Sequence, residues 1–280
     1  MIKVALPNKG ALFEPTLDLL NSCGYRVSKA GSNLSSIDPE NNVEFYFLRP
    51  GDIPLYISNG ILDAGITGRD FVSEQCVAPT LLRDLNYGHS RLCAAVPEES
   101  KVTTLEEIAG LRIATSLPNI VRRYFSGQQI DVVELEGAVE ISVRLGIAEA
   151  VVDVVDTGST LRQAGLRIVG EPLFQSNAAL YANPDRASEP EVEVLLARVE
   201  GKLVATEFMM VEYDCPGEIL ADACIVTPGI ESPTVTRLQR EGWYSVKAMV
   251  PRKEAHHIMD TLSRMGCRGI LLTTIESARI

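Results

Sequence analysis

Short hydrophobic runs alternate with amphipathic stretches through most of the 280-residue chain. The hydrophobic runs predict strands at 2–6, 42–47, 62–67, 91–96, 111–115, 131–135, 150–155, 166–173 and 178–182. The amphipathic stretches predict helices at 12–23, 118–125, 139–145 and 189–205. Strands that alternate with helices are typical of α/β proteins with a largely parallel sheet.

The order of elements changes after residue 206. The pattern there predicts a strand at 208–213, a helix at 217–223, strands at 225–227 and 243–250, a helix at 252–265 and a last strand at 269–275. Strand, helix, strand, strand, helix, strand is the order of a ferredoxin-like domain. We therefore predict a separate α+β domain at 207–280.

The overall composition is that of a globular protein, with 46% hydrophobic and 22% charged residues. The formal net charge is -11, which argues against non-specific nucleic-acid binding because such binding needs a basic surface. Phosphates can still bind where the few cations and backbone N–H groups gather locally.

The six cysteines are scattered, without a Cys-x-x-Cys pair or a histidine at ligand spacing. This pattern favours free thiols in a reducing compartment over a disulfide framework or a zinc site. The N-terminal residues lack the apolar core of a secretory signal, and no run approaches the ~18 apolar residues of a membrane-spanning helix. We expect a cytoplasmic protein with no membrane partner, no nucleic-acid partner and no metal site of its own.

The clearest candidate site is the segment 150–162, where a valine-rich strand leads into a loop with one glycine and three hydroxyl residues. Open α/β sheets bind ligands at the carboxyl ends of their parallel strands. Gly158 lets the backbone approach a phosphate closely, and the hydroxyls can donate hydrogen bonds to it. Asp153 lies within the strand, where a carboxylate needs partners such as the two hydroxyls of a ribose.

A simpler alternative is that Thr160 and Gln163 form a capping box, so that the hydroxyls only begin a helix. That alternative leaves Asp153 and Asp156 together unexplained, and we favour a phosphate-and-sugar site. Glu140 begins the preceding predicted helix and can reach the same ligand, although an acidic residue there also suits the helix dipole.

Further candidates follow other predicted strands. Lys9 lies after the first strand, Arg49 after the second and Asp70 after the third. Loops at one edge of a parallel sheet together form a cleft, where a lysine can meet an anion. For Lys9 the alternative is a solvated surface side chain.

Several of these segments together resemble ATP phosphoribosyltransferase, the first enzyme of histidine biosynthesis. The matching segments are VALPNKG (4–10), VEFYFLRP (43–50), DAGITGRD (63–70), GAVEIS (137–142) and DVVDTGSTLR (153–162). Asp214 with TPGIESPT (227–234) and VKAMVP (246–251) resembles the C-terminal regulatory domain of the long form. The resemblance runs in the same order along nearly the whole chain.

The resemblance implies a fold of two periplasmic-binding-protein-like α/β lobes with the active site between them, followed by a ferredoxin-like, ACT-like domain. Lobe I would contain residues 1–88 and 178–206, lobe II residues 89–177, and the regulatory domain residues 207–280. The implied reaction joins N1 of ATP to C1 of phosphoribosyl pyrophosphate and releases pyrophosphate. Mg²⁺ would be carried mainly by the substrate phosphates.

The resemblance also implies roles for particular residues. Catalytic roles fall to Lys9, Arg49 and Asp153, and substrate binding to Asp70, Glu140, Asp156, Thr157, Gly158, Ser159 and Thr160. L-histidine would bind as an inhibitor at Asp214, Ile230, Thr234, Met249 and Gly269. For Asp214, the alternative from the residues alone is that it begins a helix.

The resemblance further implies a homo-oligomer, a hexamer built from dimers. The chain departs from related long forms at Gly51, where they carry lysine, and at Leu117, where they often carry tyrosine. Two other functions fit parts of the pattern: a non-catalytic small-molecule binding protein of the same lobe fold, and a non-catalytic regulator with an amino-acid-sensing domain. The first would need a secretion signal and the second a DNA-binding or partner module, and the sequence favours the enzyme over both.

Overall fold

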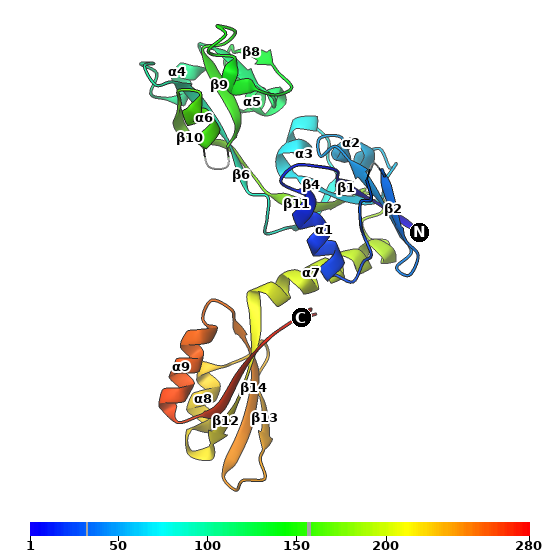
Figure 1. Ribbon diagram of the computed structural model, residues 1–280, viewed down its shortest axis with the longest axis vertical. Helices are drawn as coiled ribbons and strands as arrows, with labels where there is room; N and C mark the ends of the chain where they lie inside the picture. The colour runs from blue at the N-terminus through cyan, green and yellow to red at the C-terminus, as the bar shows by residue number, and fades with distance from the viewer. Residues whose placement is uncertain (32, 156–157) are drawn as a thin grey trace. The chain divides into compact units, whose positions relative to one another are not determined.

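Three β-sheets organise the residues that the computed structural model describes, which are 1–31, 33–155 and 158–280 (Figure 1). Contacts divide the chain into two units: residues 1–21 with 25–193, and residues 22–24 with 194–280. The first unit holds two of the sheets, which we call the sheets of lobe I and lobe II, and the second unit holds the third.

The lobe I sheet has the strand order β2-β3-β1-β4-β11-β5. Its strands are β1 (Ile2–Pro7), β2 (Ser35–Asp38), β3 (Val43–Leu48), β4 (Ala64–Gly68), β5 (Thr80–Asp84) and β11 (Ala178–Ala182). Strand β1 pairs in parallel with both β3 and β4. The loops that follow these three strands therefore leave the sheet at the same edge.

Three helices accompany the lobe I sheet: α1 (Phe13–Ser22), α2 (Ile53–Ser58) and α3 (Arg69–Gln75). Helix α2 has Asp52 at its N-cap and a proline in its first turn, where proline is well tolerated. Its apolar face, with Ile53 and Ile57 fully buried, packs into a hydrophobic cluster that includes Ala5 of β1. The packing of these side chains fixes the start of α2 beside the carboxyl edge of the sheet.

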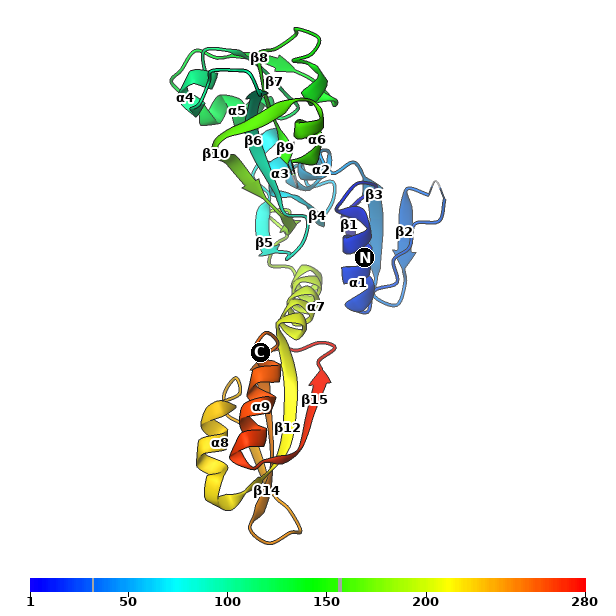
Figure 2. The same cartoon turned by 60° about the vertical axis from the view of Figure 1, so that its left-hand side comes forward.

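The lobe II sheet has the strand order β10-β6-β9-β7-β8. Its strands are β6 (Ser90–Pro97), β7 (Arg112–Thr115), β8 (Asp131–Glu134), β9 (Ala150–Val155) and β10 (Leu166–Ser176), and its helical segments are α4 (Leu105–Ile108), α5 (Pro118–Tyr124), the single 3₁₀ turn η1 (Val139–Ile141) and α6 (Ser159–Gln163). Two separate hydrophobic clusters pack around this sheet. Helix α6 lies beside β9 in both views (Figures 1 and 2).

Helix α7 (Pro190–Glu207) leads into the third sheet, which has the strand order β13-β14-β12-β15. Its elements are β12 (Phe208–Pro216), the 3₁₀ turn η2 (Gly217–Ile219), α8 (Leu220–Val226), β13 (Thr234–Arg237), β14 (Trp243–Pro251), α9 (Ala255–Met265) and β15 (Arg268–Thr274). Helices α8 and α9 lie on one face of this sheet (Figure 2). Tyr213 and Val246 point into the core beneath them, whereas Glu212 and Asp214 belong to the other, helix-free face.

The predicted fold class is confirmed: two α/β lobes precede a βαββαβ domain. Two predicted elements are wrong. Residues 225–227 belong to the end of α8 and the loop after it, and the second strand of the last domain is instead β13. The predicted helix 139–145 is reduced to η1. The exact domain boundaries at 88, 177 and 206 stay predictions.

None of the helices in the described part of the chain is both long enough and apolar enough to cross a membrane.

Candidate functional site

A cavity of about 360 Å³ lies at the carboxyl end of β9. Its walls come from η1, β9 and α6, and its lining residues are Glu140, Asp153, Val154, Val155, Gly158, Ser159, Thr160 and Leu161. The structure therefore brings together the two carboxylates and the glycine–hydroxyl loop that the sequence marks as a phosphate-and-sugar site. Asp156 and Thr157, which belong to the same prediction, lie outside the described residues.

Asp153 is the most constrained of the acidic side chains at this cavity. Its Oδ1 atom accepts a hydrogen bond of 2.8 Å from the backbone N–H of Val154. Burial raises the pKa of the Asp153 carboxyl above its ordinary value, and the nearby Glu140 carboxylate raises it further. Two carboxylates that repel each other in a half-buried cavity favour a ligand with hydroxyl donors or positive charge.

The start of α6 differs from the capping alternative. The N-cap of α6 is Gly158, with φ 74, and Ser159 and Thr160 occupy the first two helical positions. The Thr160–Gln163 capping box is therefore wrong. A residue with a Cβ would be strained at this φ, so glycine suits the turn, and the two hydroxyls are not consumed as N-caps.

Lys9, Arg49 and Asp70 lie in loops at one edge of the lobe I sheet, as their positions after β1, β3 and β4 predict. Hydrogen bonds tie these loops together: the backbone N–H of Asn8 donates to the Leu48 carbonyl at 2.8 Å, and the Thr67 hydroxyl donates to the Pro50 carbonyl at 2.7 Å. Lys9 and Arg49 are exposed. Both cations are therefore accessible to an anionic ligand.

Asp70 has a different environment from these cations. It is only 7% exposed, and its Oδ1 atom accepts a hydrogen bond of 2.6 Å from the Ser176 hydroxyl at the end of β10. Burial raises the pKa of its carboxyl, although the Ser176 hydrogen bond acts in the opposite direction. The carboxylate of Asp70 thus already holds a protein partner. Its predicted contact with substrate stays a prediction.

Lys29 is a cation near this edge that the sequence analysis missed. Its Nζ atom donates a hydrogen bond of 2.9 Å to the carbonyl of Asn8, in the same loop as Lys9. The ammonium also lies 5.4 Å and 5.9 Å from the ring centroids of Phe13 and Phe47, within cation–π range. The segment around Lys29 contains no motif and no helix or strand, so only the folded chain reveals that it brings a third cation to this edge.

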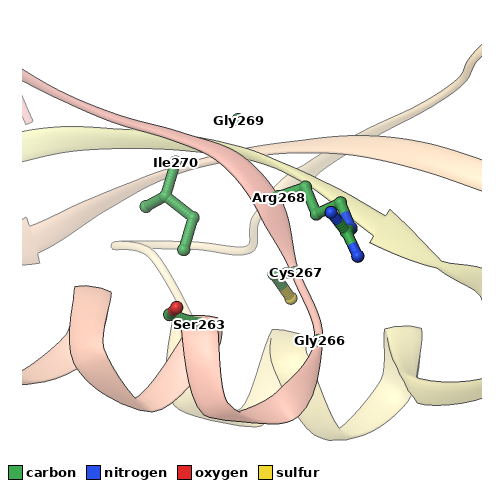
Figure 3. A pocket seen from close by; sticks show the side chains of 6 residues that line it. All are labelled: Ser263, Gly266, Cys267, Arg268, Gly269 and Ile270. Atoms are coloured by element: carbon green, nitrogen blue, oxygen red, sulfur yellow. The ribbon is translucent and has the colours of Figure 1, made fainter.

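Only some of the predicted regulatory residues lie close together on the third sheet. Asp214 lies in β12, so the alternative that it begins a helix is wrong. A Cβ added to Gly269 would lie 3.4 Å from Asp214 Oδ2, which places Gly269 directly beside that carboxylate. Gly269 also lines a cavity of about 560 Å³ with Ser263, Gly266, Cys267, Arg268 and Ile270, at the turn from α9 to β15 (Figure 3).

Met249 and Thr234 lie farther from Asp214. Asp214 pairs with Ser245 and Met210 pairs with Met249, so Met249 is four residues along β14 from the Asp214 position, or about 13 Å. Thr234 pairs with Lys247 on the edge strand β13. Ile230 lies in the loop before β13 and is 43% exposed. One copy of the sheet thus brings Asp214 to Gly269 but not to Met249.

No group of three or more His, Cys, Asp or Glu side chains suited to a metal ion is found among the described residues. The expectation that the chain has no metal site of its own stays a prediction.

Comparison with known proteins decides the family. The family model described as "ATP phosphoribosyltransferase" matches residues 49–201, and the model described as "HisG, C-terminal domain" matches residues 205–277. The chain belongs to the ATP phosphoribosyltransferase family.

Relatives match over the whole chain. The ATP phosphoribosyltransferases of Salinispora tropica and Salinibacter ruber are 46% and 43% identical to it over 283 aligned residues, with 100% of each chain covered. Among solved structures, a chain of the "ATP phosphoribosyl transferase (HisG:HisZ) complex from Thermotoga maritima" matches with a TM-score of 0.62 and 27% identity. That match covers 71% of this chain and 96% of the other.

The structure also shows the surroundings of Gly51 and Leu117. At Gly51 an added Cβ would lie 3.5 Å from the Phe71 ring, an ordinary contact, so the position has room for a side chain. Leu117 is only 5% exposed and packs within a hydrophobic cluster of lobe II. Its side chain therefore serves the core of the lobe.

Proposed function

We propose that the cavity between η1, β9 and α6 binds the 5-phosphoribosyl group of phosphoribosyl pyrophosphate. The enzyme is an ATP phosphoribosyltransferase: it transfers this group to N1 of ATP in the first step of histidine biosynthesis. The observation that carries the proposal is the meeting of Glu140, Asp153 and residues 158–160 at one cavity. Family membership favours this enzyme over a non-catalytic binding protein.

The two ends of the cavity suit the two ends of the phosphoribosyl group. The ribose hydroxyls donate hydrogen bonds to the carboxylates of Asp153 and Glu140, which relieves the unfavourable burial of the Asp153 charge. The 5-phosphate accepts hydrogen bonds from the backbone N–H groups and hydroxyls of Ser159 and Thr160 at the start of α6. From the family resemblance alone, we assign the same phosphate contact to Thr157 and a role in substrate binding to Asp156.

The cations of the lobe I edge suit the remaining phosphates. Lys9, Arg49 and Lys29 bring positive charge to loops of that sheet edge. We assign them to the phosphates of ATP and to the pyrophosphate that leaves. The resemblance implies a lysine at the position of Gly51 in related long forms, and we propose that Lys29 supplies part of that positive charge here.

The reaction needs no general base. The lone pair of the neutral N1 atom of adenine forms the bond to C1 of the ribose, and the bond between C1 and the pyrophosphate oxygen breaks with its electron pair on the leaving group. The chain therefore accelerates the reaction by aligning N1 with C1 and by stabilising the charge on pyrophosphate.

Magnesium fits the site as a companion of the substrates. Mg²⁺ commonly keeps several waters and binds through one or two carboxylates together with substrate phosphates. Glu140 and Asp153 offer such carboxylates at the cavity. The ion would neutralise phosphate charge when bound.

Calorimetric titration of the protein with phosphoribosyl pyrophosphate and Mg²⁺ tests the cavity. We expect Glu140→Gln to weaken binding by about tenfold, because one hydrogen bond to a charged acceptor is lost. The matched control is Glu134→Gln, which removes an exposed ion pair to Arg122 elsewhere in the same lobe. Equal affinity of the two variants would place the phosphoribosyl group elsewhere.

We also propose that L-histidine inhibits the enzyme from the helix-free face of the third sheet. The carboxylate of Asp214 would bind the ammonium or imidazolium group of histidine, and Gly269 leaves the space beside that carboxylate open. Because Met249 lies about 13 Å away along the sheet, a single histidine reaches both Asp214 and Met249 only if a second copy of the chain contributes one of them. This requirement supports a homo-oligomer, and the hexamer built from dimers rests on the family resemblance alone.

The regulatory proposal predicts that Asp214→Ala leaves turnover without histidine within about twofold and raises the half-inhibitory histidine concentration at least tenfold, because the ligand loses its charged partner. Steady-state assays over a histidine series measure both quantities. Thr234→Ala should act in the same direction more weakly. Unchanged inhibition in both variants, or inhibition competitive with ATP, would remove the assignment.

A further inference from the structure

Lobe I and lobe II are joined by side-chain hydrogen bonds between α3 and α5. The two carboxylate oxygens of Glu74, near the end of α3, accept hydrogen bonds of 3.0 Å each from the backbone N–H groups of Asn119 and Ile120, in the first turn of α5. The Asn119 amide donates back to the Glu74 carbonyl at 2.9 Å, and Arg123 Nη2 donates to the Ser73 carbonyl at 2.5 Å. We call these four hydrogen bonds the α3–α5 clasp.

The first turn of α5 depends on Glu74 for its backbone hydrogen bonds. The first N–H groups of any helix lack partners within the helix. At α5, the Leu117 N–H donates to the Thr115 hydroxyl at 3.0 Å, and Pro118 has no N–H to donate. The remaining two N–H groups, of Asn119 and Ile120, donate to Glu74. The N-cap of α5, Leu117, offers only an apolar side chain. This helix of lobe II therefore takes its capping carboxylate from lobe I.

The other end of α3 is attached to a strand that connects the lobes. Ser176 ends β10 in the lobe II sheet, and β11 of the lobe I sheet begins at Ala178. The Ser176 hydroxyl donates to Asp70 Oδ1 at 2.6 Å and accepts from the Asp70 backbone N–H at 3.1 Å. The first turn of helix α3 thus contacts the connection from β10 to β11, and its last turn contacts helix α5.

The clasp acts on the edge of lobe II that carries the cavity. Helix α5 begins just after β7, and β7 pairs in parallel with β9, with Thr115 opposite Val152. Val152 directly precedes Asp153, so the clasp is separated from the cavity by one strand. A change in the angle between the lobes would carry the Asn119 and Ile120 N–H groups away from Glu74. An intact clasp therefore restricts that angle.

We propose that Glu74 is a positioning residue for phosphoribosyl transfer: through the α3–α5 clasp it sets the placement of the lobe II cavity relative to the lobe I edge. The proposal rests on the assignment of the phosphoribosyl group to that cavity. A positioning role predicts an effect on alignment in the transition state with little effect on binding within lobe II, since the cavity contains no residue of α3.

Two substitutions at Glu74 and one control test the proposal. Glu74→Gln keeps one acceptor oxygen, and Glu74→Ala keeps none. We expect kcat to fall by about fivefold and about fiftyfold respectively, because small misplacements of reacting atoms are costly. The dissociation constant for ribose 5-phosphate, which would occupy only the lobe II cavity, should stay within about threefold. The control is Glu134→Gln, which removes the 2.6 Å ion pair to Arg122 of the same helix within lobe II and should leave kcat unchanged.

Hydrogen exchange reports on the clasp without using activity. Exchange of the Asn119 and Ile120 amides should become at least tenfold faster in both Glu74 variants and stay unchanged in Glu134→Gln. Faster exchange with unchanged kcat would reduce Glu74 to a helix cap and overturn the proposal, as would kcat values equal to that of the control. A wild-type protein that makes no phosphoribosyl-ATP would instead refute the transferase assignment.

Discussion

The substitution Asp153→Asn separates the contribution of this carboxylate to catalysis from its contribution to stability. Asparagine has nearly the same shape and keeps the Oδ1 acceptor, which receives the Val154 N–H at 2.8 Å. It replaces Oδ2 by an NH₂ group, so a ribose hydroxyl loses a charged acceptor and faces a donor. Loss of one charge-assisted hydrogen bond at a preorganised site costs about 2–4 kcal/mol, or roughly 30- to 1,000-fold in kcat/KM.

The effect on folding should have the opposite sign. The Asp153 pKa is raised in the folded protein by burial and then by Glu140, so the ionised carboxyl destabilises the fold once the pH rises above its ordinary pKa of 3.8. At pH 7 the free Asp153→Asn variant should therefore be at least as stable as the parent toward urea. The acidic limb of the parent's kcat/KM profile should have its midpoint above 3.8.

Coupled pyrophosphate release gives kcat/KM, and urea unfolding gives the free energy of unfolding. Near-parental kcat/KM would refute the ribose assignment of Asp153. The inference is that the Asp153 charge destabilises the fold and helps to bind the substrate. A loss of free energy of unfolding in Asp153→Asn that accounts for its lower kcat/KM would refute that inference.

Three further substitutions test separate parts of the account. Thr160→Val should lower kcat/KM about tenfold by removing a phosphate donor, while thermal unfolding changes little because Gly158, not Thr160, is the N-cap of α6. Gly51→Lys should lower the KM for ATP about threefold, since the position is open and the added ammonium joins the Lys9 edge; a higher KM would contradict that placement. Asp38→Asn should cost about 2–3 kcal/mol in urea unfolding at pH 7, because the buried carboxylate accepts from the Arg26 N–H at 2.8 Å and from Asn41. Burial raises the Asp38 pKa, but these hydrogen bonds leave it lowered overall, so the deficit of the variant should shrink as the pH falls below 3.8; a pH-independent deficit would contradict this.

Much of the first unit follows from local sequence pattern. Strand–helix alternation predicts a largely parallel sheet, and β1 does pair in parallel with β3 and β4, which gives the common edge that carries Lys9 and Arg49. The prediction is wrong for the other lobe I pairs, which are antiparallel. A capping box forms at Thr104 and Glu107, where all its groups lie within four residues of one another. Short-range pattern is not always sufficient, since the equally local capping box at Thr160 and Gln163 does not form.

Elements that depend on distant partners were not predictable in the same way. Residues 225–227 form a β-branched run that reads as a strand, yet Tyr213 draws the end of α8 inward: its hydroxyl lies 3.1 Å from the Ala223 carbonyl and 2.8 Å from the Thr227 hydroxyl. All four residues of strand β13 are exposed, and β13 pairs only with β14 among the described strands, so it carries no hydrophobic alternation. Lys29 and Glu74 have no local motif, because their partners lie 21 and 45 residues away.

Mass spectrometry of the reaction product tests the central claim most directly. Purified protein is incubated with ATP, phosphoribosyl pyrophosphate, Mg²⁺ and a pyrophosphatase that removes the second product. The account predicts accumulation of phosphoribosyl-ATP, strongly slowed by Asp153→Asn and unaffected by Glu134→Gln. Verified folded protein that forms no phosphoribosyl-ATP under these conditions would contradict it.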